Sequence, residues 1–167
     1  RSNSKSNTDN YNKKESMTYK QIVDRVRAVA EAHKMIVDFG YGNLSDIKTN
    51  GDDAEADYPY VFLNPQTHQR TSQTITYRFN MIVMDLAGED FRDVPNEEAS
   101  AFTDDIILKS EDLILYAQSD CLLIINDILA ELRYAIQETE VTLNVGLTPF
   151  EERFNDTVAG MTATIEV

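Results

Sequence analysis

Histidine, cysteine and acidic side chains build most catalytic and metal sites, and this chain of 167 residues has few of the first two. Its only histidines, His33 and His68, are far apart in the sequence: His33 ends an apolar pattern and His68 lies in a polar stretch. The single cysteine, Cys121, lies inside the apolar run CLLIINDIL, which predicts a buried apolar residue and excludes an intramolecular disulfide. No HxxxH, CxxC or DxDxDG spacing occurs. We therefore expect no metal ion and no cofactor.

Two aspartates are the acids best placed for a hydrolytic site. Asp85 ends a strand-like run and Asp120 lies on the polar side of a helical pattern, so a two-metal hydrolase would use this pair. However, carboxylates are so frequent here that one pair carries little information. The chain has no GxSxG nucleophile elbow. The glycines of GYG, Gly40 and Gly42, lack the GxxxxGK pattern of a phosphate loop and predict a tight turn. These observations favour a protein without catalytic activity.

The charge balance narrows the class of partners. Twenty-nine acidic and fifteen basic side chains give a net charge of −14, which repels phosphate backbones and argues against sequence-reading nucleic-acid binding. Nine acidic and two basic residues lie between Glu89 and Asp112. This stretch is interpreted either as solvated loops or as an acidic lining that faces DNA in transit. The sequence has no long apolar run and no signal peptide, so nothing in it indicates a membrane or export.

Folded structure is predicted to begin after residue 16. Residues 1–16 include one aromatic and no aliphatic side chain, so they are expected to form a disordered or extended arm. Thr18 and Gln21 have the spacing of a capping box, and Met17 with Ile22 that of a hydrophobic staple. A helix is therefore predicted from about Thr18 to Lys34, within a single domain that covers residues 17–167.

The strongest strand signal is the run from Gln73 to Leu86. Apolar and polar residues alternate along it, and at about 3.3 Å per residue it would span roughly 45 Å, longer than most strands. We expect part of it to contact another chain. Tyr58–Leu63 is predicted to be a short strand, with Pro59 near its start as at a sheet edge. The polar residues Asn64–Ser72 would join the two as a hairpin with a projecting tip.

The second half of the chain predicts one helix and two strands. Apolar residues spaced by three and four predict a helix from Ser110 to Glu138, about 43 Å long. Val141–Leu147 and Thr157–Val167 alternate as strands, and Pro149 is expected to stop the first. The predicted order is helix, strand, long strand, helix, strand, strand. This order favours an α+β fold in which a largely antiparallel sheet with long hairpins packs on two helices.

Aromatic and arginine side chains dominate many subunit contacts. Several occur in or beside the predicted projections, and we treat them as candidates for a subunit interface. They are Tyr41, Tyr58, Tyr60, His68, Arg70, Tyr77, Arg78, Phe150, Arg153 and Phe154.

Three segments of the sequence resemble a known family. DFGYGNLSDI, YRFNMIVMD and FEERFNDTVAGMTATIE together are similar to tail-terminator, or tail-completion, proteins of tailed bacteriophages. The likeness covers Met17 to Val167, and the segment Ala87–Tyr116 is longer than the family pattern.

The resemblance implies a structural role in the virion. Such a protein would form a ring, sixfold or a multiple, at the head–tail neck or the tail end, and would contact other neck, connector and tail proteins. DNA would pass through the lumen without specific binding, and acidic loops would suit such a lumen because they repel phosphate. The open alternative is a cytoplasmic, non-enzymatic adaptor that binds one protein partner through an exposed sheet edge.

Overall fold

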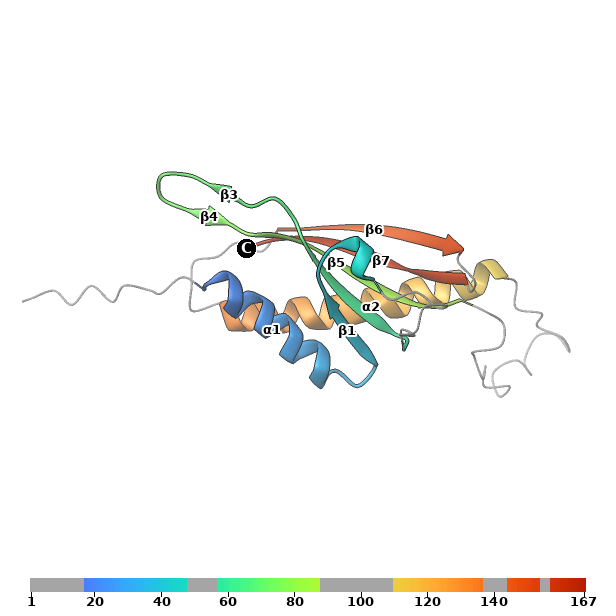
Figure 1. The fold of residues 1–167 in the computed structure, drawn as a ribbon. Coiled ribbons are helices and arrows are strands. Elements are labelled where there is room, and N and C mark those ends of the chain that lie inside the picture. The colour runs from blue at the N-terminus through green and yellow to red at the C-terminus, as the bar shows by residue number, and fades with distance from the viewer. Residues whose placement is uncertain (1–16, 48–56, 88–109, 137–143, 154–156) are drawn as a thin grey trace, which may run out of the picture.

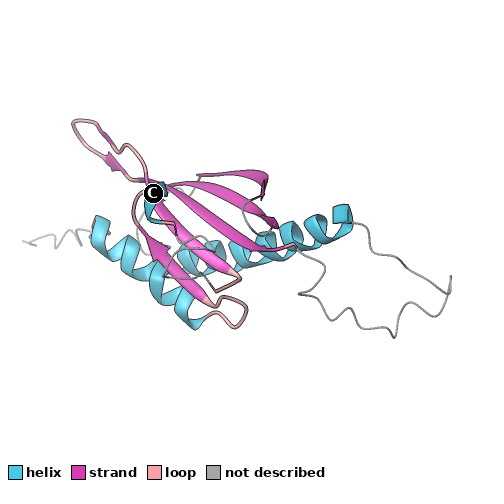
Figure 2. Ribbon diagram, turned by 45° about the vertical axis from the view of Figure 1, so that its right-hand side comes forward, coloured by secondary structure: helices cyan, strands magenta, loops and turns pink. Residues whose placement is uncertain are grey.

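Two helices cover one face of a five-stranded sheet, and a two-stranded arm projects from one end of the molecule (Figures 1 and 2). This computed structural model describes residues 17–47, 57–87, 110–136, 144–153 and 157–167; the predicted arm at residues 1–16 lies outside these ranges. The predicted α+β class is confirmed. The elements are α1 (Tyr19–Ala32), β1 (Asp38–Tyr41), the 3-10 helix η1 (Leu44–Asp46), β2 (Tyr60–Pro65), β3 (Gln69–Arg70), β4 (Ile75–Thr76), β5 (Arg78–Leu86), α2 (Ser110–Ile136), β6 (Asn144–Arg153) and β7 (Thr157–Glu166).

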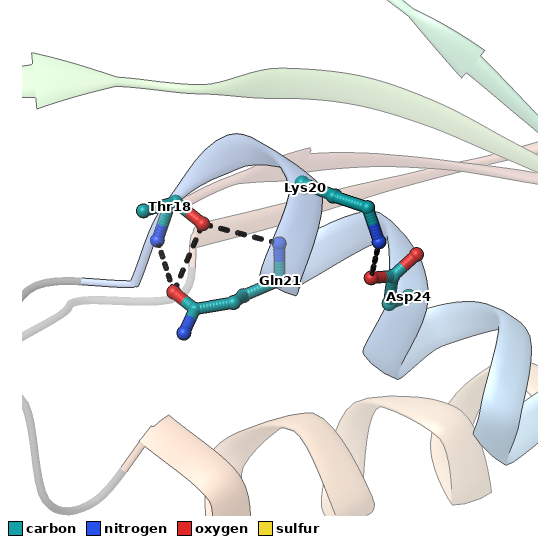
Figure 3. Close-up of polar contacts among 4 residues, drawn as sticks. All are labelled: Thr18, Lys20, Gln21 and Asp24. Carbon is teal, nitrogen blue, oxygen red and sulfur yellow. Dashed lines mark hydrogen bonds and ion pairs between the residues drawn. The ribbon is translucent and has the colours of Figure 1, made fainter.

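The predicted capping box at the start of α1 is confirmed (Figure 3). The backbone N–H of Gln21 donates to the Thr18 hydroxyl at 3.3 Å, and the Thr18 N–H donates to the Gln21 side-chain oxygen at 2.7 Å. Met17 packs against the main core cluster, to which its predicted staple partner Ile22 belongs. Local side chains therefore satisfy donors that an α-helix cannot pair internally.

We expect Thr18→Ala to lower the free energy of unfolding by about 1 kcal/mol, because the N-cap acceptor is lost. Urea denaturation followed by circular dichroism measures the change. Ser119→Ala, at an exposed position in the middle of α2, is the control, and it should not destabilise the protein because alanine favours a helix interior. Equal losses in both variants would contradict a capping role.

The sheet has the strand order β1-β2-β5-β7-β6, with only β1 and β2 parallel. Two predictions are wrong here. Residues 38–41 form a strand rather than a tight connector, and β2 is an interior strand, not an edge, because β1 pairs with its other side. A Cβ on Gly40 would lie 2.1 Å from the Tyr60 hydroxyl and 2.6 Å from Phe62 Cδ2, so this glycine leaves room for two aromatic side chains of β2. The positive φ predicted for GYG occurs at its second glycine, Gly42, which follows the strand and has a φ of 150°.

The long predicted strand is divided between two sheets. Its start, β4, pairs with β3 in the arm, whereas β5 pairs with β2 and β7 in the main sheet. Tyr77 connects the two, and its backbone exchanges hydrogen bonds of 2.8 and 2.9 Å with Val167. The prediction that Pro149 stops a strand is wrong: β6 continues through it to Arg153. An edge strand tolerates proline because half of its N–H groups point away from the sheet.

The main core lies between the helices and one face of the sheet. It joins α1 and α2 to inward residues of β2, β5 and β7, including Leu63, Met81 and Ala163, all fully buried. By length and composition alone, Asp112–Tyr134 of α2 could also cross a membrane, with a mean hydropathy of 1.5. The apolar residues on one side of this helix pack in the core.

Candidate functional site

The arm is a small antiparallel hairpin that extends beyond the main sheet (Figure 1). Gln69 pairs with Thr76 and Arg70 with Ile75. Its turn is closed by the Thr71 N–H, which donates to the Thr74 carbonyl at 2.8 Å, and by the two threonine hydroxyls, 2.8 Å apart. Ile75 is 49% exposed although it is a β-branched apolar residue. The predicted hairpin with a projecting polar tip is therefore confirmed.

An aromatic cluster holds the base of the arm. The His68 ring lies 5.0 Å from the Tyr19 ring, 5.4 Å from Tyr77 and 6.0 Å from Phe79, measured between centroids. Tyr19 stacks on Phe79 at 5.4 Å. The backbone N–H of Arg78 donates to His68 Nδ1 at 3.2 Å, so this ring nitrogen is the acceptor in that contact. Side chains from α1, β5 and the arm thus fix where the arm leaves the body.

Two tyrosine hydroxyls complete this cluster. The oxygens of Tyr19 and Tyr41 are 2.7 Å apart. Burial raises the pKa of the Tyr19 phenol well above its ordinary value, and the hydrogen bond and charge of Tyr41 add to the rise. The folded state therefore favours the neutral phenol at a pH where an unfolded tyrosine would ionise, about pH 10.

Because the pKa of Tyr19 is higher in the folded than in the unfolded state, this group contributes fully to stability below the unfolded-state pKa. That contribution is lost as the pH rises from the unfolded-state pKa through the folded-state pKa. We expect the free energy of unfolding to fall as the pH rises above about 10, and to fall less steeply in Tyr19→Phe. Urea denaturation at a series of alkaline pH values measures both slopes. Tyr134→Phe, at a tyrosine that is 73% exposed, is the matched control. A slope in Tyr19→Phe equal to that of the wild type would contradict the assignment.

The arm belongs to a segment without acidic residues. Positions 58–84 contain Arg70, Arg78 and His68 but no aspartate or glutamate, in a chain with a net charge of −14. Arg78 pairs with Glu166 of β7, with 2.7 Å between Nε and the carboxylate oxygen, so its charge is partly compensated. Arg70 lies exposed on the arm itself. The arm therefore carries its positive charge out from an acidic molecule.

The outer edge of β6 is a second surface suited to protein contacts. The Tyr77–Val167 hydrogen bonds show that odd-numbered residues of β7 bond to β5, so its even-numbered residues bond to β6. Val145, Leu147 and Glu151 consequently point their backbone N–H and C=O groups outward, while Pro149 offers only its carbonyl. Leu147 is 45% exposed. This edge can accept another strand over its first half, and proline limits pairing further along.

The opposite edge, β1, is better protected. It has four residues, and the side chain of Asp38 accepts from the Phe39 N–H at 2.8 Å. Arg27 of α1 also lies over the Phe39 ring, 5.8 Å from its centroid. The Asp38 carboxylate thus occupies the Phe39 N–H, a donor that a neighbouring strand would need. The edge of β6 is therefore the more open of the two.

The predicted interface residues fall into three groups. His68, Arg70, Tyr77 and Arg78 gather at the arm and its base, and Tyr41 joins them through Tyr19. Tyr58, Tyr60 and Phe150 instead pack in a second core on the sheet face opposite the helices. Tyr60 is only 1% exposed and so is unavailable to another subunit, which corrects its choice as an interface residue. Arg153 ends β6, its side chain is not described, and Phe154 lies outside the described residues.

The candidate acids do not form a metal centre within the described ranges. No group of three or more histidine, cysteine or acidic side chains there is placed to hold a metal ion. Asp85 is half-buried at the end of β5, where its carboxylate accepts from the Leu86 N–H at 2.8 Å. Cys121 is fully buried, as predicted, with its sulfur 3.9 Å from the Ala159 carbonyl oxygen.

Sequence reasoning missed the outer side of α2. Leu115, Tyr116, Leu123 and Tyr134 are each more than half exposed there. The available signal was that apolar residues occur around the whole helix and not only along its predicted seam.

Neither known protein families nor characterised proteins match this sequence.

Proposed function

We propose that this protein is a non-enzymatic structural component of a tailed-bacteriophage virion, of the tail-terminator or tail-completion type. It would assemble as a ring, sixfold or a multiple, at the head–tail neck or the tail end. The projecting arm is the observation that supports this proposal most directly, because a two-stranded hairpin that extends beyond its own sheet is placed to contact a neighbouring copy.

The surfaces of the molecule suit head-to-tail assembly. The arm and the outer edge of β6 are different surfaces, so a contact between them on neighbouring copies is heterologous and can close into a ring. The arm carries Arg70 and no acidic residue, whereas the whole chain is acidic, so arm and neighbour attract each other. A net charge of −14 also suits a lumen through which DNA passes without binding.

We expect Arg70→Glu to weaken assembly with little effect on folding, because the exposed side chain lies on the arm. Light scattering coupled to size-exclusion chromatography would show a shift from ring to smaller species, while the thermal melt stays within a few degrees. Lys34→Glu makes the same charge change at an exposed site beyond α1 and should leave the ring intact.

Arg78→Glu should affect both properties. It breaks the ion pair with Glu166, a pair that is about two-thirds buried on both sides, so a loss of stability is expected in addition to any loss of assembly. Unchanged ring formation in both arginine variants would contradict a role of the arm in assembly, and a strictly monomeric protein absent from virions would end the proposal.

An adaptor is the second candidate, and the open edge of β6 favours it. Such a protein would remain monomeric and capture one partner strand along Val145–Leu147. Stoichiometric one-to-one complexes with a monomeric protein would select this candidate over the ring.

A further inference from the structure

The outer surface of the two helices forms a groove. It measures about 510 Å³ and runs between α1 and α2, with Ala28, Ala32 and Ala130 among its lining residues. Alanine on both walls allows another helix to approach closely, since interaxial distances depend on the side chains at the contact. Leu123 and Tyr134 lie on the same side of α2 as Ala130, seven residues before and four after it. We call these five residues the helix face.

The helix face exposes two large apolar side chains. Leu123 is 56% exposed and Tyr134 is 73% exposed, and both share the side of α2 that carries the groove residue Ala130. Large exposed apolar side chains that share one side of a helix are typical of helix contact sites. Large apolar side chains around small ones also provide the knobs and holes that helix packing uses.

The two walls of the groove carry different charged residues. On the α1 side the groove has Arg25 and His33, and on the α2 side it has Asp127 and Glu131. His33 Nε2 lies 3.1 Å from the Asp127 carboxylate, and Arg25 lies 3.9 Å from Glu131. The two carboxylate side chains remain 67% and 59% exposed, so they can still interact with a further positive charge.

The same asymmetry extends along both helices. Alpha-helix α1 carries three basic and two acidic residues, whereas α2 carries five acidic residues and only Arg133 as a base. Within the groove itself, Arg25 is the fixed positive charge on the α1 wall, and Asp127 and Glu131 are the negative charges on the α2 wall.

We propose that the helix face is a two-fold interface with a second copy of this chain. A two-fold axis parallel to the groove places α1 of each copy against α2 of its partner, so the wall with Arg25 meets the wall with Asp127 and Glu131. A surface with this pattern is self-complementary, which an isologous contact requires. Leu123 and Tyr134 become buried, and the paired molecules form four layers: sheet, helices, helices, sheet.

This interface is distinct from the arm and from the edge of β6, and it goes beyond the proposed ring. If rings form, the two-fold joins them through their helix faces and doubles the number of subunits. If rings do not form, the protein is a simple dimer. The inference therefore survives a failure of the ring proposal.

Leu123→Arg tests the inference with Leu44→Arg as matched control. The two leucines are 56% and 58% exposed, but Leu44 lies on η1, away from the helices. We expect Leu123→Arg to halve the mass measured by light scattering and sedimentation at equal concentration, and Leu44→Arg to leave it unchanged. Ala130→Glu, which adds bulk and negative charge to the groove, should also halve the mass.

Folding is checked in each variant by circular dichroism and urea denaturation. Should Leu123→Arg fail to fold, Ala130→Glu, at an exposed helical position, carries the test. Folded variants with the wild-type mass would overturn the inference, as would a wild-type protein that is monomeric at all concentrations. A wild-type dimer that Leu123→Arg separates but Arg70→Glu does not would support the two-fold and reject the ring.

Discussion

Replacing Gly160 with alanine should destabilise the protein by about 3 kcal/mol, near the upper end of what overpacking costs. Gly160 lies in β7, between β5 and β6, opposite Met84 and Phe150. A Cβ there would lie 2.0 Å from the Val83 carbonyl oxygen and 2.9 Å from the Met84 Cα. Both are backbone atoms of the central strand β5, so relief requires the strands to separate. Urea denaturation measures the loss as a lower midpoint with an unchanged slope.

Gly146 provides the control for this substitution. It lies in the adjacent strand β6, and a Cβ there would meet no atom within 4 Å. Gly146→Ala should therefore change stability by less than about 0.5 kcal/mol, as surface substitutions usually do. If the two variants were equally stable, the close approach of β5 and β7 at Gly160 would be contradicted.

Features that depend on neighbouring residues in the sequence were predictable. The start of α1 followed from Thr18 and Gln21, because a capping box is complete within four residues. Most of α2 followed from the spacing of its apolar side chains: the helix Ser110–Ile136 matches the prediction, and the predicted end at Glu138 lies outside the described residues. The hairpin was indicated by a polar stretch between two alternating runs. In each case the physical cause lies within one or two turns of chain.

Features that depend on distant pairing were not predictable in the same way. Strand β1 has only four residues, and it becomes a strand through its parallel pairing with β2 about twenty positions later. Pro59 predicts an edge strand, but β2 is interior; Pro149 predicts the end of a strand, but edge strand β6 continues through it. The effect of proline depends on whether the strand lies at an edge, and only the sheet order decides that. The prediction for Tyr60 was wrong for a related reason. Alternation predicts the two faces of a strand but not which residues cover each face.

In the candidate site, too, local features were predictable and contacts between distant residues were not. Arg70 and His68 were assigned to a projecting tip from local polarity, and the arm carries them. Tyr19 was missed, since its contact with His68 joins residues nearly fifty positions apart. The charge separation between α1 and α2 is present in the sequence, but it acquires meaning only when the two helices lie side by side and share a groove.

Ile124→Ala should cost about 3–4 kcal/mol, because it removes a buried aliphatic side chain and leaves a cavity between α2 and the sheet. Ile124 is fully buried within the main core, which joins both helices to β2, β5 and β7. Leu115→Ala is the matched control on the same helix at a position that is 60% exposed, where a loss of less than about 1 kcal/mol is expected. Both substitutions introduce the best helix former, so helix propensity cannot account for a difference between them. The comparison distinguishes the buried side of α2 from its exposed side. A large difference means that one side of α2 packs against the sheet. Similar losses in both variants would contradict this core packing.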